Sequence, residues 1–73
     1  MITLQICFTT KKSYEEVKYF VANRSEFYGE ENDEWNMIEV ECSYQQDADL
    51  NEKLIEKELI ENNFEDFYFE IED

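Results

Sequence analysis

The side chains that could act as nucleophiles have no base to activate them. The sequence contains two cysteines, Cys7 and Cys42, together with serines and threonines, but it has no histidine. A thiol or hydroxyl becomes nucleophilic only when a base lies within hydrogen-bonding reach. A carboxylate pair could hydrolyse glycosides, but a chain of 73 residues has little room for a substrate cleft. We therefore expect no enzyme activity and no cofactor.

A calcium loop is the next chemistry to consider. Asp47, Asp49, Asn51 and Glu58 match the first, third, fifth and twelfth positions of the EF-hand pattern. The sixth position of that loop needs glycine for a sharp turn, and here it is Glu52. The surrounding apolar pattern favours a helix. We interpret Asp47 or Asp49 as a helix cap and predict no metal site.

Segment 26–35 combines carboxylates with aromatic side chains. The carboxylates of this segment are Glu26, Glu30, Glu31, Asp33 and Glu34, and its aromatic residues are Phe27, Tyr28 and Trp35. Aromatic anchors and acids together suit the binding of a protein that offers Arg or Lys. For Phe27 and Trp35 we favour burial in the core, because large aromatic side chains are usually buried. The carboxylates and Tyr28 are candidates for partner binding.

The same segment resembles the inhibitory region of the barstar family of nuclease inhibitors. Phe27, Tyr28, Gly29 and Asp33 have the spacing of that region, which also follows a first strand and helix. Trp35 comes one residue early, and the chain is too short for the full set of helices in that family. We interpret the likeness as a shared composition suited to gripping a basic protein, and not as common descent.

Regular rows of acids form the other candidate surface. Glu39 and Glu41 alternate with apolar residues, and the polar side of the last predicted strand consists of Asp66, Tyr68, Glu70 and Glu72. Two residues along a strand span about 6.6 to 6.8 Å, so each row is evenly spaced. Such rows can occupy a groove lined with Lys and Arg that holds phosphates. The alternative is a solvated sheet face that discourages pairing with other strands.

Alternation of apolar and polar residues predicts the strands that carry these rows. Every second residue is apolar from Ile2 to Phe8, from Ile38 to Tyr44 and from Phe67 to Ile71. A short strand at 27–28 would be followed by a turn over 29–34.

Two helices separate the strands. Ser13 and Glu16 form a capping box that begins a helix from about Tyr14 to Arg24. The second helix runs to about Asn62, where the Asn62–Asn63 pair suits a left-handed end. The core-facing side chains of the two helices are predicted to be Val17, Phe20, Val21, Leu54, Ile55 and Leu59.

This order of elements predicts an α+β fold in one domain over residues 1–73, a small two-layer α/β sandwich. A ferredoxin-like βαββαβ arrangement fits best, with the strands beginning at Ile2 and Ile38 in the centre. Its second sheet face would be open to water and would carry the acidic rows. The alternative is a βαβαβ fold with a three-stranded parallel sheet, in which the acidic segment is an irregular loop.

Charge is distributed unevenly along the chain, whose net charge is −14. Residues 1–24 hold four basic and two acidic side chains, whereas residues 25–73 hold two basic and 18 acidic ones. Such a surface repels nucleic acid and anionic lipid over a Debye length of about 8 Å, and it attracts basic proteins. We expect a basic protein partner, no direct nucleic-acid binding and no membrane binding.

The N-terminus and the cysteines indicate the compartment. Residues 1–6 contain neither a basic region nor a continuous apolar stretch, so we expect no signal peptide and a cytoplasmic protein. Two cysteines are too few for a secreted disulfide scaffold, and we expect both to be reduced thiols. In the predicted register Cys7 points outward and Cys42 points inward.

These features favour an inhibitor that mimics nucleic acid and blocks a basic nucleic-acid-binding protein. Phages and mobile elements direct such anti-restriction and anti-CRISPR proteins at nucleases. The first alternative is an immunity protein or antitoxin that caps a basic nuclease toxin through segment 26–35. The second is an acidic regulatory interaction module without inhibitory activity. In each case we expect a monomer or a homodimer.

Overall fold

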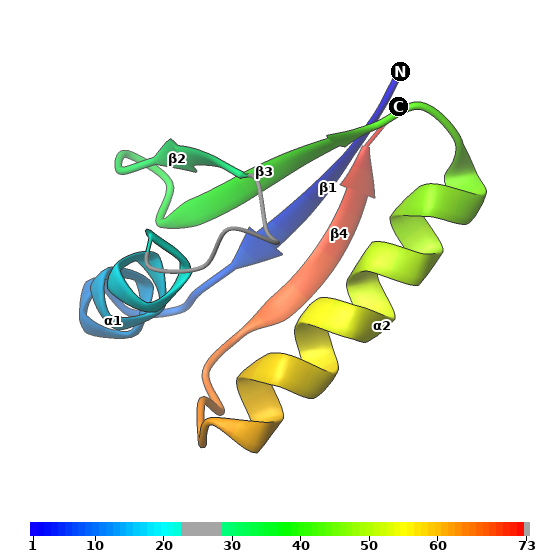
Figure 1. Ribbon diagram of the computed structural model, residues 1–73. Coiled ribbons are helices and arrows are strands. Elements are labelled where there is room, and N and C mark those ends of the chain that lie inside the picture. The colour runs from blue at the N-terminus through cyan, green and yellow to red at the C-terminus, as the bar shows by residue number, and fades with distance from the viewer. Residues whose placement is uncertain (23–28, 73) are drawn as a thin grey trace.

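The computed structural model describes residues 1–22 and 29–72 of the chain. In chain order the elements are β1 (Ile2–Cys7), α1 (Lys11–Ala22), β2 (Glu30–Asn32), β3 (Met37–Cys42), α2 (Gln45–Glu61) and β4 (Tyr68–Glu72) (Figure 1). The four strands form one sheet in the order β2-β3-β1-β4, and all neighbouring strands are antiparallel. The predicted α+β two-layer sandwich is confirmed. The three-stranded parallel alternative is wrong, because β2 pairs with β3.

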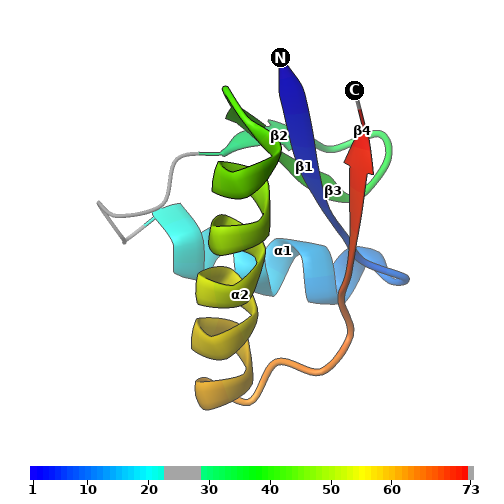
Figure 2. The same ribbon diagram turned by 90° about the vertical axis from the view of Figure 1, so that its right-hand side faces the viewer.

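Strands β1 and β3 are central, and β4 lies beside β1, as predicted for the βαββαβ order. The axis of α1 lies across that of α2, and the two helices are not side by side (Figure 2). The finer, ferredoxin-like assignment therefore stays a prediction. The start of β1 and the end of β4 lie side by side, because Thr3 pairs with Glu72 in the antiparallel register.

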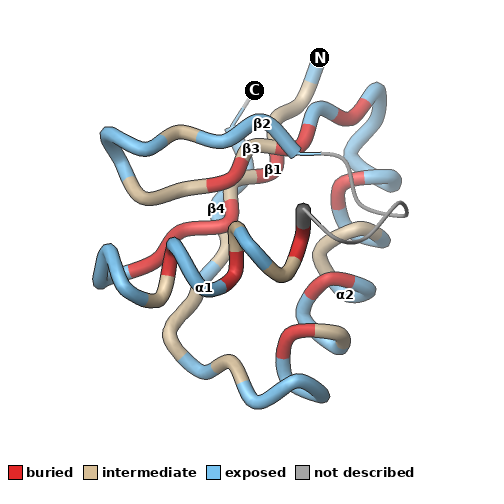
Figure 3. The backbone as a smooth tube through the Cα atoms, turned by 60° about the vertical axis from the view of Figure 1, so that its left-hand side comes forward, coloured by how far each residue is buried: buried red, intermediate tan, exposed pale blue. Residues whose placement is uncertain are grey.

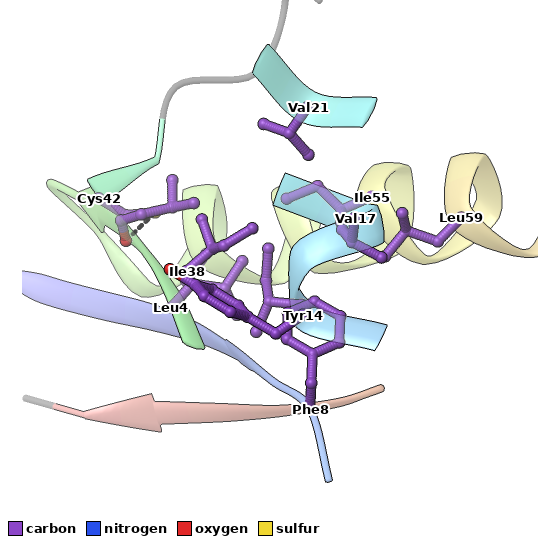
Figure 4. Close-up of a cluster of buried hydrophobic side chains, with 12 residues drawn as sticks. Leu4, Phe8, Tyr14, Val17, Val21, Ile38, Cys42, Ile55 and Leu59 are labelled. Atoms are coloured by element: carbon purple, nitrogen blue, oxygen red, sulfur yellow. Dashed lines mark hydrogen bonds between the residues drawn. The ribbon is translucent and has the colours of Figure 1, made fainter. Parts of the chain in front are cut away.

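The core lies between one sheet face and the two helices (Figures 3 and 4). Leu4, Ile6 and Ile38 project from the central strands and are at most 1% exposed. Tyr14 and Val17 from α1 and Ile55 and Leu59 from α2 close over them, as do the other members of the cluster. Close packing of this kind provides most of the free energy that stabilises so small a domain.

The first helix begins three residues earlier than predicted. The side chain of Thr10, and not that of Ser13, caps the helix, because the Thr10 Oγ1 accepts a hydrogen bond from the Ser13 N–H at 3.1 Å. The carboxylate of Asp66 accepts further hydrogen bonds from the N–H groups of Thr9 and Thr10, at 3.3 and 3.2 Å. A residue from the loop before β4 thus completes the cap of α1.

The second helix begins without the predicted aspartate cap. Tyr44 occupies the capping position of α2 and makes no side-chain hydrogen bond there. Asp47 lies inside the first turn, and Asp49 accepts a hydrogen bond from Gln45 Nε2 at 3.0 Å. Both cap assignments are therefore wrong, although an acid in the first turn still interacts favourably with the helix dipole.

The predicted left-handed end of α2 is confirmed at Asn63, whose φ is 67°. The N–H of Phe64 donates to the carbonyl of Leu59, and that of Asn63 donates to Ile60, both at 3.0 Å. This pair of bonds is a Schellman motif, which satisfies the last carbonyls of the helix.

The buried side of α2 differs from the prediction at one position. Ala48, Ile55 and Leu59 are buried, whereas Leu54 is 56% exposed. Consecutive residues of a helix are about 100° apart, so Leu54 cannot share the side that Ile55 and Leu59 bury.

The hairpin of β2 and β3 is displaced relative to the prediction. The expected turn over 29–34 is wrong in its position, because Glu30–Asn32 is a strand and residues 33–36 form the turn. The predicted strand at 27–28 lies outside the described residues. A Cβ on Gly29 would clash with Cγ2 of the buried Ile38, so this position needs glycine for close approach to β3.

Over the described residues, neither helix has the length and apolar character required to cross a membrane.

Candidate functional site: the acidic sheet face

The strand register collects the predicted acidic rows on the sheet face that the helices leave open. Leu4 pairs with Val40 and Ile71, which places these three side chains on the helix side. The intervening residues point to the opposite side because side chains alternate along a strand. The carboxylates on this side, which we call the acidic sheet face, are Glu30, Glu39, Glu41, Glu70 and Glu72.

A neutral strand separates the acidic rows. Glu39 and Glu70 both pair with Gln5, on either side of β1, and Glu41 and Glu72 both pair with Thr3. Neighbouring strands are about 4.8 Å apart, so the β3 and β4 rows are about 10 Å apart. The face therefore carries two lines of negative charge that flank an uncharged strip.

Two amide side chains hold carboxylates of the acidic sheet face in place. Gln5 Nε2 donates to Glu72 Oε2 at 3.0 Å, and Asn32 Nδ2 donates to Glu39 Oε1 at 3.4 Å. These neutral donors orient the acids without cancelling their charge.

Within residues 1–22 and 29–72, the basic side chains lie in the other layer. The sequences of the four strands contain no Lys or Arg. Lys11, Lys12 and Lys18 belong to α1, and Lys53 and Lys57 belong to α2. Each described Lys thus lies in a helix, and none lies on the acidic sheet face.

One end of the open face is apolar. Cys7 pairs with Met37 on one side and with Tyr68 on the other. The register places Cys7 on the open face, as predicted, yet its side chain is buried and only 4% exposed. Because Tyr68 is the cross-strand partner of Cys7, its side chain lies beside the thiol at this end of the face.

The acids around Cys7 affect its titration. Burial is the main cause of a raised pKa for Cys7, and the charges of Glu70 and Glu39 raise it further, while the Tyr68 hydroxyl opposes them. The pKa of Tyr68 is itself raised, first by the charge at Cys7. Glu39 and Glu70 thus both raise the pKa of the Cys7 thiol, one from β3 and the other from β4, on either side of β1.

The remaining described acids of segment 26–35 lie in β2 and in the hairpin turn. Asp33 Oδ1 accepts hydrogen bonds from the Tyr14 hydroxyl at 2.5 Å and from Lys18 Nζ at 3.1 Å. These two bonds lower the pKa of Asp33. Asp33 therefore attaches the turn to α1, while Glu31 and Glu34 are exposed.

Trp35 was expected in the core, and that expectation is wrong. Its side chain is 65% exposed at the tip of the hairpin, where the backbone N–H donates to Asn32 Oδ1 at 3.2 Å. Composition alone carries no signal of this exposure.

Asp66 does not belong to the acidic sheet face. It precedes β4, so its predicted place in the last strand is wrong. Its carboxylate binds the backbone and hydroxyl groups of Thr9 and Thr10, and the hydrogen bond from the Thr9 hydroxyl is the main cause of a pKa of about 2. Asp66 therefore has a structural role in capping α1.

The structure thus brings Glu39, Glu41, Glu70 and Glu72 together and adds Glu30, which sequence analysis had assigned to the loop. Glu31 pairs with Ile38 and so points to the other side of β2. Glu26 and Tyr28 lie outside the described residues.

The segment with the partial calcium-loop pattern is part of the continuous helix α2, as predicted. Within residues 1–22 and 29–72 there is no group of three or more acidic or cysteine ligands arranged to hold a metal ion.

Comparisons of the chain with family models, with curated proteins and with solved structures found no match. The arguments for function rest on the geometry and charge described above.

Proposed function

We propose that the protein is an inhibitor that offers its acidic sheet face to a basic nucleic-acid-binding protein in place of nucleic acid. The observation that carries the proposal is the gathering of five carboxylates from three strands on one face whose strands contain no basic residue. A groove that binds phosphates is lined with Lys and Arg, and it accepts negative charge with little dependence on base sequence. Two parallel lines of carboxylates on a rigid sheet satisfy such a groove.

Solubility alone does not explain this arrangement. Mixed charges of both signs keep a surface soluble, and the chain has lysines that are placed only in helices. Glu30 and Glu39 are directly opposite each other on paired strands, where like charges destabilise a sheet. Retention of such a pair at the expense of stability is typical of a surface with a binding role.

Nucleic acid itself is a poor ligand for this face. Four-stranded sheets that bind single-stranded RNA use aromatic side chains to stack bases and cations to hold the backbone. Here carboxylates occupy the corresponding open face and would repel phosphates. We expect no gel shift of DNA or RNA by the pure protein at about 150 mM salt. A retained shift would contradict the mimic function directly.

Competitive capture tests the proposal. The immobilised protein is incubated with a nuclease-treated lysate, and retained proteins are then challenged with a DNA duplex or with single-stranded RNA. We expect retained proteins to be basic and to be released by nucleic acid, because both ligands need the same groove. Retention that persists at saturating nucleic acid would show that the surface is used for something else.

Two charge-matched variants locate the binding surface. One removes three exposed acids of the acidic sheet face, and the other removes three exposed acids elsewhere. The substitutions are Glu41→Gln, Glu70→Gln and Glu72→Gln in the first variant and Glu16→Gln, Glu56→Gln and Glu65→Gln in the second. Both change the net charge equally, so a loss of capture confined to the first variant assigns binding to the sheet face. Equal losses of capture in the two variants would show that binding depends on the net charge of the protein and not on the sheet face.

A second candidate function is an immunity protein that caps a nuclease toxin through its hairpin. The exposure of Trp35 beside Glu34 favours it, because aromatic anchors with acidic neighbours are frequent energetic centres of interfaces. Trp35→Ala separates the two functions. A loss of capture on this substitution, with the sheet-face variant unaffected, would favour the hairpin.

A further inference from the structure

Helix α2 has a second apolar strip on the side that faces away from the core. Leu50 and Leu54 are 57% and 56% exposed, one turn apart. At about 100° per residue, the strip lies nearly opposite the side formed by Ala48, Ile55 and Leu59. Figure 3 shows the outer side of α2 as exposed along the helix. Neither leucine belongs to the core cluster of the fold.

The residues along this strip follow the spacing of a helix-pairing seam. Positions 47, 50, 54, 57 and 61 are separated alternately by three and four residues, which is the a/d spacing of a coiled coil. Leu50 and Leu54 lie between Asp47 and Lys57, and Glu61 lies about one turn beyond Lys57 at the end of the helix. In the described part of the chain, neither Asp47 nor Lys57 forms an ion pair.

Of the two ways in which a second copy of α2 can pair with this seam, only the antiparallel one brings opposite charges together. When two α2 helices run in opposite directions with Leu50 of one against Leu54 of the other, residue 47 meets residue 57. Asp47 of each protomer then faces Lys57 of its partner, which makes two equivalent pairs about a twofold axis. A parallel pairing would place Asp47 against Asp47 and Lys57 against Lys57, which is repulsive.

We propose that the protein self-associates through the outer side of α2, as an antiparallel helix pair centred on Leu50 and Leu54. Charge complementarity identifies a second copy of this chain as the occupant. Because α2 covers the opposite face of the sheet, the dimer leaves both acidic sheet faces free and directed outward. The dimer is then bivalent towards a basic target.

The seam is short, so the association is weak. Two leucines per protomer bury much less than the roughly 800 Å² per partner of a stable interface. The net charge of −14 on each copy opposes association at long range. We therefore expect a monomer–dimer equilibrium that depends on concentration between about 10 µM and about 1 mM.

Sedimentation equilibrium of the full chain at about 0.15 M salt tests the proposal. The variant Leu50→Gln with Leu54→Gln is expected to raise the dissociation constant by at least about tenfold. Ile60→Gln is the matched control, because Ile60 is equally exposed on the same helix but lies off the seam. Circular dichroism verifies that each variant is folded.

Charge exchange gives a test that does not depend on the leucines. Asp47→Lys and Lys57→Asp, each alone, place like charges opposite each other and should weaken association by about tenfold or more. The double exchange restores both pairs as well as the original net charge, so it should recover the wild-type dissociation constant.

A wild-type chain that remains monomeric over the whole concentration range overturns the proposal. So does a double exchange that fails to recover, or an Asp47→Lys variant that associates more tightly because its net charge is lower. Loss of partner capture in the leucine variant of a strictly monomeric chain would instead make α2 a partner surface. The association measurements do not involve the acidic sheet face, so the proposed function is tested separately.

Discussion

The hydroxyl of the buried Tyr14 donates a hydrogen bond of 2.5 Å to the carboxylate of Asp33 and so joins α1 to the hairpin turn. Lys18 completes the cluster by binding the same carboxylate oxygen at 3.1 Å. Burial, followed by the hydrogen bond to Asp33, raises the pKa of Tyr14, so this hydroxyl is protonated and can donate at neutral pH. The cluster fixes the base of the turn that presents Trp35.

Tyr14→Phe should lower the free energy of unfolding by about 1 kcal/mol, because it removes one hydrogen bond to a charged group while the exposed Asp33 regains water. Urea denaturation followed by circular dichroism measures the change. Tyr44→Phe is the matched control, since Tyr44 is 70% exposed. An equal effect of the two substitutions would show that the Tyr14–Asp33 bond contributes nothing.

The ionised carboxylate of Asp66 should make the stability of the fold decrease at low pH. Hydrogen bonds from Thr9 are the largest cause of its low pKa of about 2, compared with an ordinary value of 3.8. Because the folded-state pKa is depressed, the stabilisation is complete above about pH 4 and is lost as the pH falls towards 2. The difference in stability between the wild type and Asp66→Asn should therefore narrow between pH 4 and pH 2.

Thermal denaturation at several pH values measures this difference, with Glu65→Gln as the control for removal of a neighbouring exposed carboxylate. A wild-type advantage that stays constant down to pH 2 would show that the cap does not require the ionised carboxylate.

The facing pair Glu30 and Glu39 should make the protein less stable than it could be. Glu30→Lys converts a repulsive cross-strand pair into an attractive one and should raise the free energy of unfolding by about 0.2 to 1 kcal/mol. Added salt should reduce this gain by screening. Glu31→Lys, on the same strand but opposite Ile38, is the control. If the proposed function is correct, the stabilised Glu30→Lys variant should also capture less of the basic partner.

The Cys7 thiol should react slowly with an aromatic disulfide reagent, because it is buried and its pKa is raised. Tyr68→Ala removes the ring and hydroxyl that lie over it and should increase its labelling rate by at least about tenfold. Mass spectrometry distinguishes Cys7 from Cys42, whose rate should not change. Faster labelling of both cysteines would indicate general loosening of the fold, and not the loss of a local cover.

Much of the fold could be predicted from local patterns. Alternation of apolar and polar residues located β1 and β3, because a strand with one buried face must repeat every two residues. The same alternation placed Glu39, Glu41, Glu70 and Glu72 on the polar sides of their strands. The Asn63 end of α2 was also predictable, since asparagine tolerates the left-handed conformation better than most residues.

Contacts between distant segments decided the rest. Asp66 caps a helix that begins more than 50 residues earlier, as the separation of 56 between Asp66 and Thr10 shows, and no local pattern encodes such a bond. Trp35 is exposed and Cys7 is buried for the same reason: burial depends on what packs over a side chain, and not on its type. Tyr68 covers the thiol, whereas nothing in the hairpin covers the indole.

The sequence by itself determined that the C-terminal two thirds of the chain is acidic and that its acids alternate along strands. Only the tertiary structure decided that strands distant in sequence pair in a register that aligns those acids on one face, with Glu30 added from β2. The physical reason is that a one-residue shift of register would exchange the two faces of a strand. Burial of Leu4, Ile6 and Ile38 against the helices selects the register, and the position of the charges follows from it.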